Sequence, residues 1–297
     1  MVGSAVVRKF EAEGYTCLIT RTHAELELRD QAAVKAFFEA EKPEYVVMAG
    51  AKVGGIMANK TYPAEFLLEN LEVQNNVIMQ SYRNGVKKLC FLGSSCIYPC
   101  KAPQPIKEEY LMTGPLEPTN EGYALAKIAG YKLCLYLTRE YGFNTISLMP
   151  CNLYGTNDNY DPESSHVFPA FIRRFAEAAD DRTPEVVLWG TGTPLREFLH
   201  VDDVADAVYF FLQNHDDPEI VNIGYGTDIT IRKLSENIAE AAGYSGRIAW
   251  DASKPDGMYR KLLDSSRARS LGWRPRIALE DGIVRTMAEY RRSRGLR

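Results

Sequence analysis

The sequence predicts an α/β protein with a doubly wound parallel sheet of the Rossmann type and a smaller C-terminal domain. Short, almost continuously apolar segments alternate with longer amphipathic segments along the first half of the chain. Continuous apolar character is typical of strands that are buried on both faces, and strand–helix alternation is typical of a parallel sheet. The composition, 45% hydrophobic and 25% charged over 297 residues, is that of an ordinary globular protein.

The elements of the first region follow from these patterns. Apolar residues at three- and four-residue spacing predict its helices, and short apolar runs predict its strands. We expect strands over residues 16–20, 45–49, 88–92 and 144–149, and helices over residues 1–10, 30–41, 66–83 and 121–141. Residues 1–157 are expected to form a dinucleotide-binding domain.

A loop rich in Asp, Asn, Pro and Ser follows Asn157 and ends near His166. Beyond it we expect helices over residues 167–178, 203–213, 231–242 and 279–292, and strands over residues 185–189 and 220–223. Residues 158–196 and 225–297 are expected to form the substrate-binding domain, with residues 197–224 returning to the first domain.

The start of the chain departs from this pattern. Doubly wound dinucleotide folds open with a strand and a glycine-rich turn, whose amides hold the cofactor pyrophosphate. Here residues 1–10 read as the helix that follows such a turn, and Gly3 is its only glycine. A central strand with about three buried aliphatic side chains contributes roughly 5 to 9 kcal/mol. We therefore expect Met1 to be internal to a natural protein that starts about a dozen residues upstream.

Charge and cysteine content exclude several classes of function. The net charge of −4 comes without a long basic or acidic block, which argues against nucleic acid or membrane as a partner. No apolar run reaches the roughly 18 residues of a membrane span, and we expect a cytoplasmic protein. Cys96 and Cys100 resemble half of a metal site, but no second ligand pair follows, so we expect no metal.

Two short segments carry the chemistry of a carbonyl reduction site. Residues 93–99 place Ser94 and Cys96 close together. Tyr123 and Lys127 lie four residues apart on a predicted helix and share a face, so the ammonium is expected to lower the phenol's pKa from about 10. Among 17 tyrosines roughly one such pair is expected by chance, so the prediction depends on its combination with the other motifs.

The ordered set of motifs at residues 51–56, 93–99, 117–121, 152–155, 196–203 and 251–257 resembles the GDP-L-fucose synthases over the whole chain. These are extended short-chain dehydrogenase/reductases. The resemblance implies that one pocket epimerises GDP-4-keto-6-deoxy-D-mannose at C3 and C5 and then reduces the C4 ketone with NADPH. It also implies a homodimer formed through the helices over residues 66–83 and 121–141.

The resemblance implies two sets of catalytic residues. Tyr123 would protonate the ketone oxygen, Ser94 would hydrogen-bond it, and Lys127 would stabilise the phenolate and hold the cofactor ribose. Cys96 and His166 would invert C3 and C5 from opposite faces, with the thiol ionised by a cation such as Lys127 or the oxidised nicotinamide. The alternatives are a structural Cys96 and a surface His166.

NADP is expected rather than NAD. Arg21, Thr22 and His23 follow the strand predicted over residues 16–20, and no acidic residue is present there to bind a bare ribose 2′-hydroxyl. Arg21 could instead be an exposed surface charge. The expected cofactor contacts, most of them implied by the resemblance, are Gly3, Arg21, His23, Leu92, Gly93, Ser94, Ser95, Tyr123, Lys127, Pro150, Cys151, Asn152, Leu153 and His166.

The diphosphate and purine of a GDP-sugar require cationic groups and a flat apolar face. The residues that the resemblance implies for them are Arg174, Trp189, Arg196, Asp256 and Lys261. Arg173 and Arg174 face about 100° apart on a helix, so only one need point inward, and Arg173 is expected to be solvated. Trp189 could also belong to the core.

Two other functions stay open. One is an NAD(P)-dependent reductase or 4-epimerase of another nucleotide sugar, with Cys96 incidental. The other is a catalytically silent binding or regulatory protein, because the glycine-rich cofactor turn is missing from the sequence.

Overall fold

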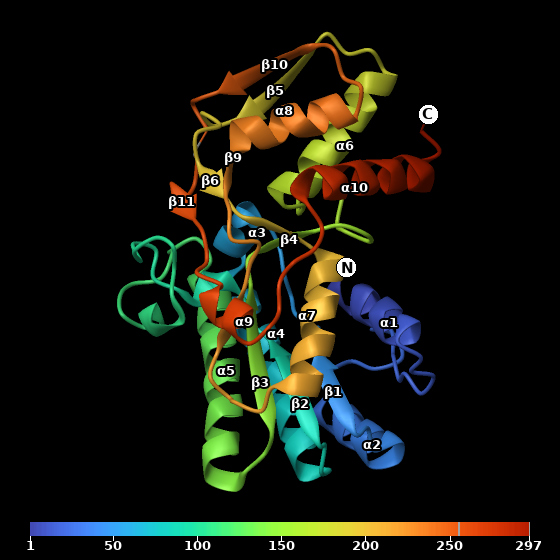
Figure 1. The fold of residues 1–297 in the computed structure, drawn as a ribbon, viewed down its shortest axis with the longest axis vertical. Coiled ribbons are helices and arrows are strands. Elements are labelled where there is room, and N and C mark those ends of the chain that lie inside the picture. Colours follow the sequence, from blue (N-terminus) through green and yellow to red (C-terminus); the bar gives the residue numbers. More distant parts are fainter. Residues whose placement is uncertain (255, 297) are drawn as a thin grey trace.

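The computed structural model describes residues 1–254 and 256–296. Its centre is a parallel sheet of four strands in the order β1-β2-β3-β8 (Figure 1). In register, Val47 lies opposite Cys90 and Cys90 lies opposite Ile146. All side chains of the two central strands are buried, which explains their continuous apolar character. The predicted doubly wound fold is confirmed. The strands are β1 (Tyr45–Met48), β2 (Lys88–Leu92), β3 (Thr145–Pro150) and β8 (Val221–Ile223).

Helices cover both faces of this sheet (Figure 1). α4 (Pro63–Arg83) and α5 (Glu121–Tyr141) pack side by side on one face, and α1 (Val2–Ala12) and α7 (Val201–Asn214) pack on the other. α5 lies close to the sheet at Gly130, where an added Cβ would lie 2.6 Å from the ring of Phe91. α2 (Gln31–Glu41) packs against α4.

The strand predicted over residues 16–20 is wrong. In the described part of the chain these residues form no strand, and four of their five side chains are exposed. A strand needs a hydrogen-bonding neighbour, and β1 pairs only with β2 among the described strands. The apolar run therefore has no sheet edge to join. The other predicted elements are present with small shifts of their ends; α4, for example, begins earlier than predicted, with Pro63 in its first turn.

A second hydrophobic cluster lies beyond the carboxyl end of the sheet (Figure 1). It is formed by α6 (Val167–Asp180), α8 (Ile231–Ala241) and α10 (Leu279–Arg294), together with the parallel pair β5 (Glu185–Trp189) and β10 (Arg247–Asp251). Stacking of Tyr154 on Phe168, with ring centroids 4.0 Å apart, forms part of this cluster.

Short paired strands connect the two parts. The pairs are β4 (Asn152–Tyr154) with β7 (Phe198–His200), and β6 (Leu195–Arg196) with both β11 (Arg260–Lys261) and β9 (Ile229–Thr230). The remaining elements are α3 (Ile56–Thr61), α9 (Ser266–Ser270), and the 3₁₀ turns η1 (Ser95–Ile97) and η2 (Glu108–Tyr110). Within the described residues, no helix has the length and apolar content to cross a membrane.

Candidate active site

The candidate active site begins where the chain leaves β2. A Cβ at Gly93 would lie 2.2 Å from the sulfur of Met149, so only glycine fits between the ends of β2 and β3 without rearrangement. Ser94 follows, and its Oγ accepts a hydrogen bond from the amide of Cys96 at 3.2 Å. This hydrogen bond caps η1 and presents Ser94 and Cys96 at the carboxyl edge of the sheet.

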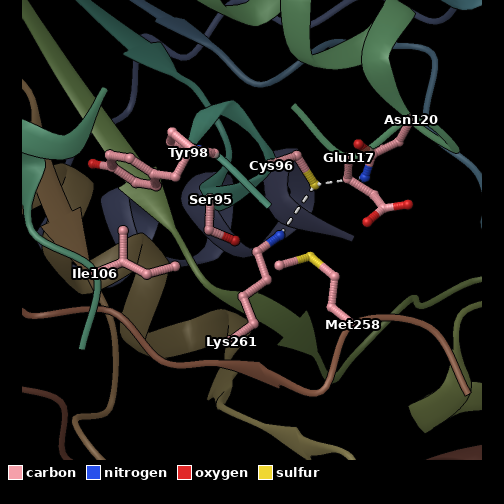
Figure 2. A pocket seen from close by; sticks show the side chains of 9 residues that line it. Ser95, Cys96, Tyr98, Ile106, Glu117, Asn120, Met258 and Lys261 are labelled. Atoms are coloured by element: carbon pink, nitrogen blue, oxygen red, sulfur yellow. Dashed lines mark hydrogen bonds between the residues drawn. The ribbon is translucent and has the colours of Figure 1, made fainter. Parts of the chain in front are cut away.

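The thiol of Cys96 is half-buried and surrounded by hydrogen-bond donors (Figure 2). Lys261 Nζ lies 3.3 Å from Sγ, and Asn120 Nδ2 lies 3.4 Å from it. Burial alone would raise the pKa of the Cys96 thiol, but the charge of Lys261 and the hydrogen bonds involving Ser94, Lys261 and Asn120 outweigh it. The pKa of Cys96 therefore lies below its ordinary value, which suits a base.

These two neighbours of the thiol differ from the sequence expectations. Lys261 was expected at the substrate and Lys127 at the thiol, whereas the structure brings Lys261 to Cys96. Asn120 was not predicted as a site residue. Its only signal in the sequence was its place in the motif at residues 117–121, directly before the helix that carries Tyr123.

The expected effect of Lys127 on Tyr123 is wrong. Burial raises the pKa of Tyr123 well above its ordinary value; the charge of Cys96 adds to this rise, and a hydrogen bond with Ser94 opposes it. Lys127 Nζ instead donates a hydrogen bond to the carbonyl oxygen of Leu92 at 2.9 Å and lies 5.9 Å from the centre of the Tyr123 ring. The phenol is thus held in its protonated form, as a proton donor.

Lys127 fits the ribose of a nucleotide cofactor. Its side chain is 3% exposed, and burial lowers its pKa to about 8. Among the described residues the ammonium has one hydrogen-bond acceptor, the carbonyl of Leu92. Two of its three N–H groups are left for ribose hydroxyls.

The other expected cofactor residues lie in three places. Gly93, Ser95, Pro150, Cys151, Asn152 and Leu153 lie at or beyond the ends of β2 and β3. Gly3 lies at the start of α1, where an added Cβ would be 3.8 Å from Ala49 beyond β1. Arg21 and His23 are instead engaged by carboxylates: Arg21 pairs with Glu41 and covers the Phe37 ring, and the exposed His23 lies 3.2 Å from Glu27.

His166 is exposed and directly precedes α6. Loss of hydration and the positive charge of Lys261 lower its pKa below the ordinary value. The loop before His166 packs against the motif at residues 51–56, because Gly55 N donates to Ser164 O at 3.2 Å. An added Cβ at Gly55 would lie 3.2 Å from Ser165 O. This glycine therefore positions the loop of His166, a role that sequence reasoning missed.

The expected substrate residues lie in the second part of the molecule. Arg174 Nη2 donates to Val187 O at 2.5 Å, beside Trp189 on the same strand. Trp189 is 62% exposed, so the alternative that it belongs to the core is wrong. Arg173, expected to be solvated, is half-buried and lies 3.2 Å from Glu177.

Arg196 and Asp256 form the other part of this group. Burial lowers the pKa of the half-buried Arg196, and the negative charge of Asp256 partly opposes this effect. Asp256 accepts hydrogen bonds from the amide and hydroxyl of Thr191, each at 2.7 Å. Thr191 follows β5, so Asp256, which binds Thr191, lies near the Trp189 end of that strand. Arg196 lies close enough to Asp256 to be affected by its charge.

A doubly wound sheet whose carboxyl edge carries a serine, a tyrosine and a buried lysine defines a nucleotide-binding protein of the dehydrogenase and epimerase class. The chain belongs to the NAD dependent epimerase/dehydratase family, whose model matches residues 1–224.

Named relatives and a solved structure narrow this class. The chain is 57% identical to GDP-L-fucose synthase 1 of Arabidopsis thaliana over 290 residues, which cover 98% of this chain and 90% of that protein. It is 51% identical to GDP-L-fucose synthase of Escherichia coli (strain K12) over 295 residues, covering 96% and 92%. The structure of a GDP-L-fucose synthetase from Naegleria fowleri bound to NADP matches with a TM-score of 0.91 at 27% identity, covering 99% of this chain and 92% of that chain.

Proposed function

We propose that the protein converts GDP-4-keto-6-deoxy-D-mannose to GDP-L-fucose by 3,5-epimerisation followed by NADPH-dependent reduction of the C4 ketone. The observation that carries this proposal is the Cys96 thiol. Its pKa is lowered, and it lies beside the serine and tyrosine of a carbonyl reduction site. The relatives at 57% and 51% identity, both GDP-L-fucose synthases, support the same reaction.

The epimerisation needs a base and an acid on opposite faces of the sugar. Protons next to the C4 ketone are acidic, because the resulting carbanion is stabilised as an enolate. Cys96 thiolate takes such a proton, so that the C–H bond breaks, an S–H bond forms and the electron pair moves onto the ketone oxygen. Protonated His166 returns a proton to the same carbon from the other face, which inverts it.

The reduction uses the same ketone. NADPH, when bound, supplies the hydride. Tyr123, held protonated by its burial, donates its proton to the ketone oxygen, and Ser94 donates a hydrogen bond to that oxygen. Lys127 would hold the ribose with its two remaining N–H groups.

The GDP part of the substrate fits the second part of the molecule. Arg174 and Arg196 supply guanidinium groups for the diphosphate, and the exposed Trp189 supplies a flat face for the base. Asp256 completes this group as an acceptor. We accordingly assign the sheet region with residues 197–224 to cofactor binding, and residues 158–196 and 225–297 to substrate binding.

A Cys96→Ser variant tests the function. Wild-type protein incubated in D₂O with the keto sugar nucleotide should incorporate deuterium at C3 and C5 and then form GDP-L-fucose with NADPH. Cys96→Ser should lose most of the deuterium incorporation but still reduce a ketone that is already epimerised. Wild-type reduction without deuterium at C3 and C5 would favour a reductase or 4-epimerase of another nucleotide sugar.

We also propose a homodimer through α4 and α5, which the exposed apolar side chains of these helices support. Leu68 on α4 is 57% exposed, and Leu125 and Tyr136 on α5 are 44% and 50% exposed. Leu125→Glu should lower the molecular mass measured by sedimentation from that of a dimer to that of a monomer, whereas an unchanged dimer would place the interface elsewhere. We also propose a cytoplasmic location, which the six free cysteines favour.

A further inference from the structure

Lys261 acts on both groups that are proposed to invert the sugar. Its Nζ is 3.3 Å from Cys96 Sγ, and its positive charge is also a cause of the lowered pKa of His166. Because an ammonium favours a neighbouring anion and disfavours a neighbouring cation, it stabilises a Cys96 thiolate and makes protonated His166 a stronger acid. The ionic partner of the thiolate is then Lys261 and not His166.

The backbone around Lys261 is fixed from several directions. β11 pairs with β6, so that Lys261 lies opposite Arg196. The next amide, of Leu262, donates to Gln104 Oε1 at 2.9 Å, and the amide of Leu263 donates to Glu197 Oε2 at 3.0 Å. These contacts fix the backbone from which the Lys261 side chain reaches the thiol.

Asn120 supports the same sulfur from α5. Its Nδ2 donates to Cys96 Sγ at 3.4 Å, and Asn120 is also the N-cap of α5. The positive end of a helix dipole favours a nearby anion. Asn120 Oδ1 is buried and has no hydrogen-bond partner among the described residues, so the amide is oriented by its contact with sulfur.

Lys127, the cation expected from the sequence, is directed elsewhere. Its Nζ donates to Leu92 O and lies 5.1 Å from the centre of the Phe91 ring. The Ser94 hydroxyl and the buried Tyr123 phenol also act on Cys96 or are acted on by it. Glu117 lines the same pocket as the thiol (Figure 2). Of these, the carboxylate of Glu117 opposes the thiolate and the Ser94 hydroxyl favours it, as Lys261 and Asn120 do; the positive charge comes from Lys261.

We propose that Lys261, assisted by Asn120, is a positioning residue that holds Cys96 as the thiolate base, and that it does not bind the diphosphate of the substrate. This inference rests on the proposed function, because it names the group that prepares the epimerisation base. The inference also distinguishes Lys261 from His166: removal of Lys261 changes the ionisation of Cys96, whereas removal of His166 does not.

The ionisation of Cys96 can be measured without substrate. The rate of alkylation by iodoacetamide is followed against pH, and peptide mass spectrometry separates Cys96 from the exposed Cys17. Lys261→Met should move the midpoint of this pH profile up by at least one pH unit and lower the alkylation rate of Cys96 at pH 7 about tenfold. Lys261→Arg should keep most of the wild-type rate. Lys233→Met, at an exposed lysine of α8, is the matched control and should change nothing.

Two further variants keep the test decisive. Asn120→Asp has nearly the same size but places a carboxylate beside the sulfur, so it should also raise the midpoint. His166→Asn should leave the midpoint within a few tenths of a unit. An unchanged midpoint in Lys261→Met and Asn120→Asp would overturn the inference.

The catalytic readout separates positioning from substrate binding. Lys261→Met should lower kcat for deuterium exchange about tenfold and move its pH optimum upward, with KM nearly unchanged. A tenfold rise in KM with unchanged kcat would assign Lys261 to the diphosphate and overturn the inference. If the wild-type thiol titrates with a lowered midpoint that depends on Lys261, but no deuterium exchange occurs, the proposed function fails while the assignment of Lys261 as the counterion stands.

Discussion

Lys127 donates its hydrogen bond to the carbonyl oxygen of Leu92, at 2.9 Å, and not to the phenol of Tyr123. The ammonium therefore lies at the carboxyl end of β2, next to the place where a cofactor ribose is proposed to bind. Tyr123 keeps its proton because it is buried, and Lys127 is itself easily deprotonated for the same reason. The pKa values of both residues are thus set mainly by burial.

Replacement of Lys127 by Met should slow the reduction about 100-fold, because the ribose of the bound cofactor would lose the ammonium that positions it. The pKa of Lys127 falls from 10.5 to about 8 on folding, so the folded protein binds fewer protons than the unfolded chain between these values. Wild type should therefore gain up to about 3 kcal/mol in free energy of unfolding, relative to Lys127→Met, as pH rises from 8 to 10.5. Urea titrations at several pH values measure this, with Lys233→Met as control; equal pH slopes in wild type and Lys127→Met would refute it.

Much of the fold could be predicted because its signals are local. The run Leu89 to Leu92 is apolar throughout, and the strand there is buried on both faces. Gly142, with φ of 70°, ends α5 at the place where the helical pattern stops. The residues 16–20 show where this reasoning fails, since an apolar run becomes a strand only beside a partner strand that the run itself does not specify.

The candidate site was less predictable because its contacts are not local. Lys261 and Cys96 are 165 residues apart in sequence, and no spacing rule connects them. The Tyr123–Lys127 pair was found from its helical spacing, but its electrostatics depend on burial, which the spacing does not report. The sequence thus indicated which residues carry the chemistry, and the packing decides which of them act on each other.

Replacement of Gly55 by Ala should impair the step that uses His166 more than the reduction. The added Cβ would lie 3.2 Å from Ser165 O, so the loop that carries His166 has to move by a few tenths of an ångström. Deuterium exchange into the substrate should fall about tenfold, as small misplacements of catalytic groups commonly cost that much or more. Reduction of an already epimerised ketone should stay within about twofold of wild type. Equal losses in both assays would show a general disturbance of the fold. Gly243→Ala, at a glycine with φ of 67° just beyond the C-terminal end of α8, serves as a comparison for loss of stability alone.

Glu197 should make the stability of the protein depend on pH near neutrality. Burial raises the pKa of Glu197 from 4.5 to about 7, although the amides of Gly226 and Leu263, at 2.6 and 3.0 Å, favour its ionised form. The folded protein binds more protons than the unfolded chain between these values, so its free energy of unfolding falls as pH rises through that window, by at most about 3 kcal/mol.

Glu197→Gln removes this titration, and its stability should therefore vary less between pH 5 and pH 7 than that of wild type. The variant should also be less stable at pH 5, because its amide group offers one acceptor oxygen where two backbone amides donate. Denaturation of wild type, Glu197→Gln and the exposed-site control Glu236→Gln over this range measures both effects. Parallel curves for wild type and Glu197→Gln would mean that Glu197 is ionised throughout.

Arg21 must exchange one anion for another if it binds the 2′-phosphate of NADPH. In the structure it pairs with Glu41 and donates to Thr20 O at 2.8 Å. Because a partly exposed ion pair is worth at most about 1 kcal/mol, Glu41→Gln should tighten NADPH binding up to about fivefold, whereas Arg21→Ala should weaken it about tenfold. NADH binding should change in neither variant, since NADH carries no 2′-phosphate. Fluorescence titrations with both cofactors test this, with Arg29→Ala, an exposed arginine paired with Glu27, as the matched control. Unchanged NADPH affinity in Arg21→Ala would show that Arg21 is a surface charge held by Glu41.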